Sequence, residues 1–203
     1  MNNYEYIVAS LPALQQDDAR SEKLDVQGLV DEIRSQISAH DAEVLSVLLG
    51  GFNSDKLNPD FYRAALKHSN RFIRDWFRFD LDLRNITVSY INDSLGRPEN
   101  QDMILLEGRE TEEFFELEDA KAVLNMGDIL KRERGLDELR WQKIDALTVL
   151  DDFNLEALLG YVAKLKIIDR WLQLDPDSGR ELFRRLVEDV RSTYDNKKQN
   201  LTI

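Results

Sequence analysis

The sequence contains no cysteine and few of several other residue types that define common protein classes. Without cysteine, a disulfide framework and a thiolate zinc site are both excluded. The two histidines, His40 and His68, are too few for a His-rich metal site, and we expect no metal and no cofactor. Four prolines and nine glycines are too few for a turn-rich β-sandwich or a linker array. These absences favour a helical protein.

Long apolar runs are also missing. The apolar stretch from Tyr6 to Leu14 has no basic region before it and is too short for the core of a signal peptide, so none is expected. No apolar run approaches the roughly 18 residues of a membrane span, which predicts that the chain does not cross a bilayer. The net charge of −12 disfavours general affinity for nucleic acid or anionic lipid.

The negative charge is concentrated in the middle of the chain. Residues 99–156 hold 17 acidic and 7 basic side chains, whereas residues 157–203 hold 7 acidic and 9 basic ones. The acidic segment is either the solvated face of helices or a docking surface for a basic partner.

Apolar residues recur at helical spacing along most of the chain. The fold class is therefore predicted to be all-α: an elongated bundle of about seven helices in a single domain, 1–203, with 1–98 and 99–203 as candidate lobes. The opening, 4–12, is expected to be a short strand or extended segment that ends at Pro12. Helices are expected after the N-cap Asp25, around 44–49, from Pro59 to at least Phe79 and on to Leu95, after the cap Thr111, over 136–152, over 155–173, and from Asp175 onward.

Two charged groups are candidate partner-binding residues. At about 100° per residue, five basic residues of the helix that begins near Pro59 fall within an arc of roughly 80°. This basic stripe is a solvated surface, a partner for acidic helices of the same chain, or a site for an acidic partner or a nucleic-acid backbone. Three glutamates lie in the first turns of the helix that Thr111 caps. The candidates are Arg63, Lys67, Arg71, Arg74, Arg78, Glu112, Glu113 and Glu116.

Motifs for catalysis are missing from the sequence. There is no glycine-rich phosphate loop, and Ser46, Ser69 and Ser89 have no nucleophile-elbow motif around them. The three glutamates resemble one part of a di-metal site, but the Glu-x-x-His motifs that such sites need are absent. The sequence therefore predicts that the protein is not an enzyme.

Three stretches carry a resemblance to a known family. Tyr4–Leu14 is similar to an opening of the form Y-x-Y-x-V-A-x-L-x-A, Phe79–Thr87 to an acidic-x-x-Asn-Leu/Ile helix motif, and Leu155–Arg170 to a closing helix. Together they resemble the C/d subunit family of V-type and A-type rotary ATPases. The whole sequence is also similar to a small uncharacterised bacterial family encoded in V-type ATPase operons, as a shortened C-like subunit.

The resemblance implies a non-catalytic subunit of an ion-transporting V-type ATPase or ATP synthase, linking the rotor shaft to the membrane ring. Its partners would be the central shaft and the membrane rotor ring, and it would be cytoplasmic, peripheral to the inner face of the cell membrane through those partners. Nucleic acid is not expected as a partner. The alternative is a soluble helical adaptor or regulatory scaffold that binds an acidic protein through the basic stripe.

Overall fold

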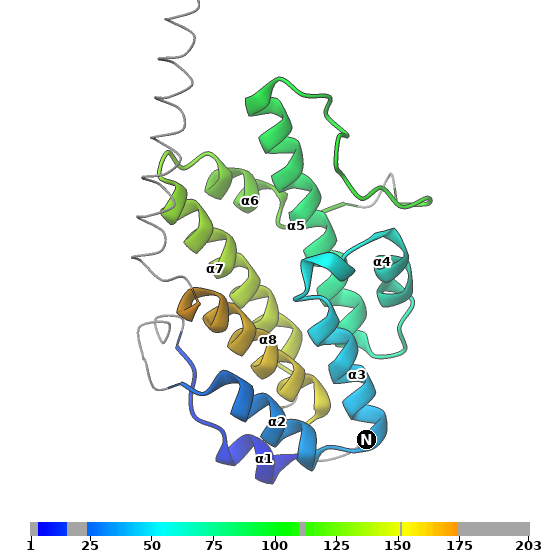
Figure 1. Ribbon diagram of the computed structural model, residues 1–203, viewed down its shortest axis with the longest axis vertical. Helices are drawn as coiled ribbons and strands as arrows, with labels where there is room; N and C mark the ends of the chain where they lie inside the picture. Colours follow the sequence, from blue (N-terminus) through cyan, green and yellow to red (C-terminus); the bar gives the residue numbers. More distant parts are fainter. Residues whose placement is uncertain (1–3, 16–23, 110–112, 151, 174–203) are drawn as a thin grey trace, which may run out of the picture.

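The computed structural model describes residues 4–15, 24–109, 113–150 and 152–173. Within these ranges it contains eight α-helices, one short 3-10 helix and no strand, which confirms the all-α prediction (Figure 1). The helix expected from Asp175 lies outside the described residues. The helices are α1 (Glu5–Ser10), α2 (Val26–Gln36), α3 (Ala39–Gly50), η2 (Ser54–Lys56), α4 (Pro59–Leu66), α5 (Arg71–Leu95), α6 (Leu117–Leu124), α7 (Ile129–Thr148) and α8 (Leu155–Leu172).

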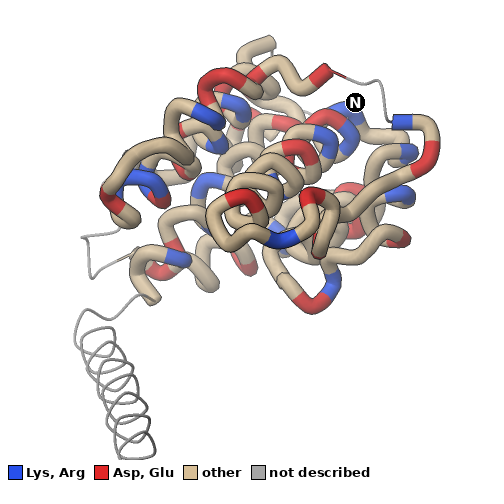
Figure 2. The backbone as a smooth tube through the Cα atoms, turned by 90° about the horizontal axis from the view of Figure 1, so that it is seen from above, with Lys and Arg blue, Asp and Glu red and all other residues tan. Residues whose placement is uncertain are grey.

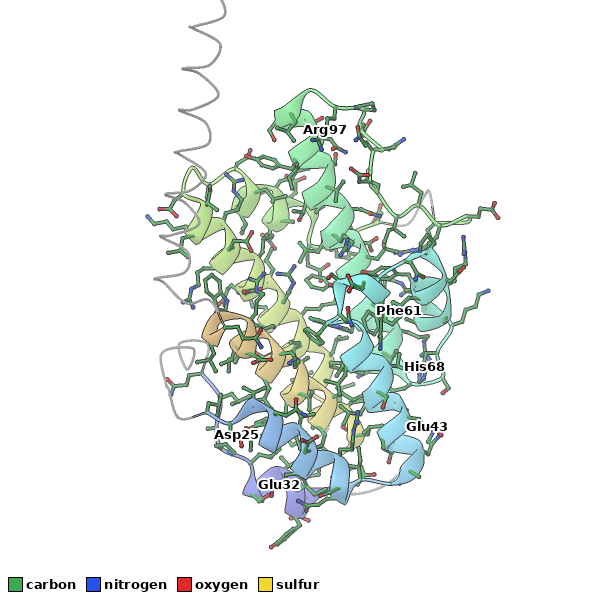
Figure 3. All side chains as sticks on the ribbon, in the orientation of Figure 1. Asp25, Glu32, Glu43, Phe61, His68 and Arg97 are labelled. Atoms are coloured by element: carbon green, nitrogen blue, oxygen red, sulfur yellow. The ribbon has the colours of Figure 1, made fainter. Side chains whose placement is uncertain are left out.

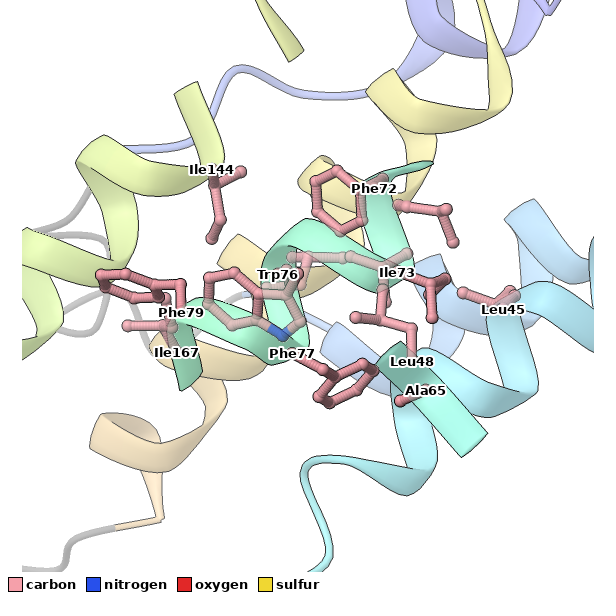
Figure 4. Close-up of a cluster of buried hydrophobic side chains, with 14 of the residues drawn as sticks. Leu45, Leu48, Ala65, Phe72, Ile73, Trp76, Phe77, Phe79, Ile144 and Ile167 are labelled. Carbon is pink, nitrogen blue, oxygen red and sulfur yellow. The ribbon is translucent and has the colours of Figure 1, made fainter. Parts of the chain in front are cut away.

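The helices pack around one hydrophobic core. α8 packs against α2, α3 and α7, and α5 packs against α3, α4, α6 and α7. In Figure 1, α1 and α2 lie below α8, and α4 lies to the right of α5. Figure 4 shows aromatic side chains of α5 lying among residues of α3, α4, α7 and α8. Helices from both sides of residue 98 thus contribute to the same core. None of the described helices is long and apolar enough to cross a membrane.

Polar side chains at the helix starts explain where most helices begin. The carboxylate of Asp25 accepts a hydrogen bond from the Gly28 N–H, which confirms the predicted cap of α2. Such a bond satisfies one of the backbone donors that a helix start leaves open. The other side chains that cap in this way are Ser38, Asn53, Asn58, Asn70, Asp128 and Asn154.

The prediction of a single helix from Pro59 to Phe79 is wrong, because the chain turns at residues 67–70. Asn70 caps α5, and the Arg74 guanidinium donates to the carbonyl oxygens of His68 and Ser69, both at 2.7 Å. α4 therefore folds back onto α5, where the Tyr62 hydroxyl donates to Asp80 at 2.6 Å. Periodicity alone missed this break because the apolar faces of the two helices stay in phase across it.

The prediction of a strand or extended segment over 4–12 is also wrong for its first part, since residues 5–10 form α1. Contacts with distant residues hold this short helix: the Tyr4 N–H donates to the Phe153 carbonyl at 2.7 Å, and Ile7 is buried in the core. The expected restriction before Pro12 is present, because Leu11 is extended and ends the helix.

Two boundaries in the acidic middle of the chain differ from the prediction. Glu113 is not helical, and the helix expected to follow Thr111 begins only at Leu117. The Phe114 ring instead packs on Phe79, with 5.9 Å between ring centroids. The other difference is that α7 begins at Ile129 and runs through Gly135, where a break was expected.

Glycines allow two close helix contacts. A Cβ at Gly135 would lie 2.7 Å from Cγ1 of Val123, so α6 and α7 meet at this point. A Cβ at Gly160, in the buried part of α8, would lie 2.5 Å from Cγ2 of Thr148 and 3.1 Å from Cγ2 of Ile144. Both contacts are closer than a larger side chain allows.

We expect Gly160→Ala to lower the free energy of unfolding by about 1–3 kcal/mol, because the added methyl group overpacks the contact between α7 and α8. Urea denaturation followed by tryptophan fluorescence measures this change. Gly127→Ala is the matched control, since a Cβ there meets nothing within 4 Å. Equal stability of the two variants would contradict the role of Gly160 in this contact.

Candidate functional site

An irregular segment crosses α5 and is held there by side chains of that helix. We call residues 97–109 the strap; it leaves the upper end of α5 in Figure 1 and descends towards α4. The buried amide of Asn92 donates to the carbonyl oxygens of Glu99 and Gln101 at 3.0 and 2.7 Å. Figure 3 labels Arg97, where the strap begins.

Two further side chains of α5 fix the lower half of the strap. The Asn85 amide donates to the Ile104 carbonyl at 2.9 Å and accepts from the Ile104 N–H at 3.0 Å. One turn earlier, both oxygens of Asp82 accept from Arg109 at 3.0 Å. Asp82 and Asn85 are the acidic residue and the asparagine of the acidic-x-x-Asn motif noted in the sequence. Their arrangement on one face of α5 positions the strap.

The strap completes a pocket of about 340 Å³ against α4 and α5. We call it the basic pocket, because four cationic side chains line it: Arg63, Lys67, Arg78 and Arg109. Leu66 and Leu106 add apolar surface, and Glu107 is the single acidic lining residue. The fold thus brings three members of the predicted stripe together with a fourth cation from the strap.

The other two members of the predicted stripe serve the fold. Arg71 donates to the Leu147 carbonyl at 3.1 Å, which ties α5 to the end of α7. Arg74 holds the turn between α4 and α5 through its bonds to His68 and Ser69. The predicted stripe therefore contains two kinds of residue: Arg71 and Arg74 hold the fold, and the other three line the basic pocket.

Of the three predicted glutamates, two lie among the described residues. Glu112 lies outside the described residues, and Glu113 is exposed beyond the strap. Glu116 accepts from Lys143 of α7 at 2.7 Å, with both side chains about three-quarters buried. We expected all three on one side of a helix, and the structure places neither Glu113 nor Glu116 inside a helix.

Sequence reasoning missed Arg109. It lies in a loop, where helical periodicity assigns no position to a side chain, and its place depends on Asp82, which is 27 residues away. The only local signal was its isolation, as the one base among the acidic residues 99–120.

A second polar pocket, of about 380 Å³, lies where α3, α5 and α8 begin. Its lining includes the helix caps Ser38, Asn70 and Asn154, so these side chains are engaged in holding helix starts. His40 and Asp41 also line it, and Asp41 accepts from the Tyr4 hydroxyl. Within the ranges the structure covers, no three His, Asp or Glu side chains are grouped so that they could hold a metal ion.

His68 lies in the turn between α4 and α5 (Figure 3). Its Nδ1 accepts a hydrogen bond from the Asn70 N–H at 3.0 Å, which requires that nitrogen to carry no proton. Burial, followed by the nearby charges of His40 and Arg74, lowers the pKa of His68 below its ordinary value. The turn is therefore built around a neutral histidine.

Comparison with known proteins gives one family match. Residues 51–193 match the family described as "Protein of unknown function (DUF2764)", which covers α4 to α8 and the strap. No curated protein and no solved structure matches the chain.

Acidification should destabilise the protein through His68. Because the pKa of His68 is lowered on folding, the unfolded chain takes up the proton first, and stability is lost as the pH falls below about 6.5. Asn can accept the same backbone bond but does not titrate, so we expect His68→Asn to show a weaker loss. Urea titrations of both proteins between pH 7.5 and 5.5 measure this difference. Parallel pH profiles would contradict it.

Replacing Asn85 should loosen the strap without unfolding the helices. We expect Asn85→Ala to speed hydrogen exchange at the Ile104 amide at least about tenfold, because both bonds between these residues are lost. Hydrogen-exchange mass spectrometry over 103–109 reports the change. Ser89→Ala, one turn further along α5, is the control, and equal protection in the two variants would show that Asn85 does not anchor the strap.

Proposed function

The chain belongs to the DUF2764 family, whose function is unknown, and we propose that it is a helical, non-catalytic subunit of a V-type ATPase or ATP synthase. In this proposal it links the rotor shaft to the membrane ring and stays peripheral to the cytoplasmic face of the membrane through these partners. The proposal starts from the resemblance of Tyr4–Leu14, Phe79–Thr87 and Leu155–Arg170 to the C/d subunit family.

The observation that carries the proposal is that residues of all three stretches are buried in one hydrophobic core, and that the first and third stretches contact each other. They form α1 with the residues after it, the middle of α5, and α8. The Tyr161 hydroxyl of the third stretch donates to the Pro12 carbonyl of the first at 3.0 Å.

Residues within the three similar stretches also have structural roles. Asp82 and Asn85 anchor the strap, and eight residues of α8 are buried. A subunit that transmits torque needs a body that keeps its shape under load, and it needs no chemical step. Close packing in the core supports such rigidity, because packed interiors resist deformation.

The basic pocket favours the second candidate function, a helical adaptor that binds an acidic protein. Arg63, Lys67 and Arg78 remain together after the predicted stripe is divided. The two functions differ in the partner they require, so a single experiment separates them.

Affinity purification of the tagged protein after gentle solubilisation tests the proposal. We expect V-type catalytic and membrane-ring subunits to co-purify at near-stoichiometric levels, identified by mass spectrometry. An untagged strain is the control. Absence of these subunits, with an intact motor in the same extract, would contradict the rotor function and leave the adaptor.

The acidic region beyond the strap is a predicted contact surface with a basic partner. We expect Glu113→Lys combined with Glu118→Lys to lower recovery of the motor subunits several-fold, because both side chains are exposed and reversal replaces attraction by repulsion. Recovery from cells and the circular dichroism spectrum are measured together. Glu43→Lys, an exposed change on α3 (Figure 3), is the control. Unchanged recovery would remove this region from the interface.

A further inference from the structure

We propose that Phe115 anchors a basic partner protein. Its ring packs against apolar side chains of the partner, and Lys or Arg residues beside those side chains face the carboxylates around Phe115. This inference deepens the proposed function by naming a contact residue and the chemistry of the surface that receives it. It rests on the proposed function only for the identity of the partner, because the ring and its neighbouring charges are the same in any assembly.

Phe115 is the most exposed large apolar side chain in the part of the chain that the structure describes, at 87 %. Phenylalanine is one of the residue types most often buried, and covering an exposed ring with apolar surface is favourable. The preceding residue, Phe114, is partly buried and packs on Phe79 of α5. Two adjacent phenylalanines thus differ: Phe114 attaches the segment to the fold, and Phe115 faces solvent.

The fold holds the residues on both sides of Phe115. Glu116 accepts a hydrogen bond from Lys143 of α7 at 2.7 Å, and both side chains are largely buried. The Leu117 N–H donates to the Phe114 carbonyl at 3.2 Å, which closes a turn that contains Phe115. α6 begins directly after this turn. Because the backbone is already fixed, the anchor loses little conformational entropy when a partner binds.

The charges near Phe115 are mostly negative. Glu113 is exposed on one side of it in the sequence, and Glu118 and Asp119 are exposed in the first turn of α6 on the other. Phe115 also borders a pocket of about 220 Å³ between α5 and α7. The acidic lining residues of this pocket are Asp75, Asp82, Glu113 and Glu116, and the basic ones are Arg78 and Lys143. Basic side chains around an apolar partner surface complement this arrangement.

An anionic membrane surface is a poorer acceptor for the exposed ring. Glu113, Glu118 and Asp119 would be repelled by acidic lipid headgroups, as would the net charge of −12. Figure 2 shows acidic and basic positions interspersed over the described fold, so recognition depends on local groups of charges rather than on one charged face. A basic protein surface suits both the ring and the charges beside it.

Fluorescence anisotropy with defined peptides tests the proposal on the full chain. The probes are labelled peptides of four Lys-Lys-Leu repeats and of four Lys-Lys-Ser repeats, which carry the same charge. We expect the leucine peptide to bind at least about fivefold more tightly, because only its side chains can cover the Phe115 ring. Equal binding of the two peptides, or no binding of the leucine peptide, would overturn the proposal.

Matched alanine variants locate the apolar contact. Phe115→Ala should weaken binding of the leucine peptide about fivefold and leave binding of the serine peptide unchanged, because it removes the ring that leucine contacts. Tyr6→Ala removes another aromatic ring, 83 % exposed on α1, and should change neither affinity. Circular dichroism checks that both variants keep their helices. Equal effects of the two variants, or equal losses for the two peptides, would contradict the role of Phe115.

Charge reversals test the electrostatic part at physiological ionic strength. Glu113→Lys should weaken binding of both peptides about fivefold, because repulsion replaces attraction beside the ring. Glu43→Lys makes the same change in net charge at an exposed position of α3 and should leave both affinities unchanged. Equal weakening by the two variants would show that net charge alone binds the peptides, which would overturn the proposal.

A second copy of the chain is the alternative occupant of the Phe115 surface. Analytical ultracentrifugation of the unchanged protein and of Phe115→Ala detects it. The same oligomeric state in both samples supports a separate partner. A dimer that Phe115→Ala converts into a monomer would overturn the proposal, because the chain itself would then cover the ring.

The inference and the proposed function fail separately. If peptide binding depends on Phe115 but no motor subunit co-purifies, the anchor stands and the rotor function is contradicted. If the motor co-purifies but the leucine peptide binds equally to the unchanged protein and to Phe115→Ala, the rotor function stands and the anchor is overturned.

Discussion

The enclosure of α8 is the constraint on which the rest of the structure depends. Eight of its residues are buried, and α2, α3 and α7 all pack against it. A helix buried over most of its surface must meet its neighbours at fitted distances. Gly160 allows a close approach to Thr148 of α7. α5 then takes its position from α3 and α7, and it carries α4 and the strap.

A buried carboxylate fixes the other end of the pair formed by α7 and α8. Asp137 of α7 is 2 % exposed and accepts from Arg140 at 2.8 Å, from Trp171 Nε1 at 2.6 Å, and from Arg170. Arg134 lies over the Trp171 ring at 4.0 Å. A buried charge is tolerated only when several partners satisfy it, and such a cluster specifies one arrangement of the two helices. Together with the contact at Gly160, it aligns α7 and α8 along their length.

The basic pocket shows how this rigid core produces a candidate binding surface. Arg63, Lys67 and Arg78 were visible in the sequence as part of a stripe, because their spacing on a helix is regular. Arg109 was not visible, because its position depends on Asp82, far away in the chain. Tertiary contacts then divide the stripe: Arg71 and Arg74 hold the fold, while the others line the pocket.

The all-α class, the cap at Asp25, the helix start at Pro59 and the extent of α8 followed from the sequence alone, because local periodicity and the chemistry of helix starts determine them. The loop after Gly96 was also predicted, but the helix at 5–10, the bonds that hold the strap against α5 and the passage of α7 through Gly135 were decided only in the tertiary structure. In these places contacts between distant residues outweigh weak local preferences. Tyr4 is hydrogen-bonded to Phe153, and Asn85 is hydrogen-bonded to Ile104. Val123 packs so closely against Gly135 that a larger side chain would not fit there.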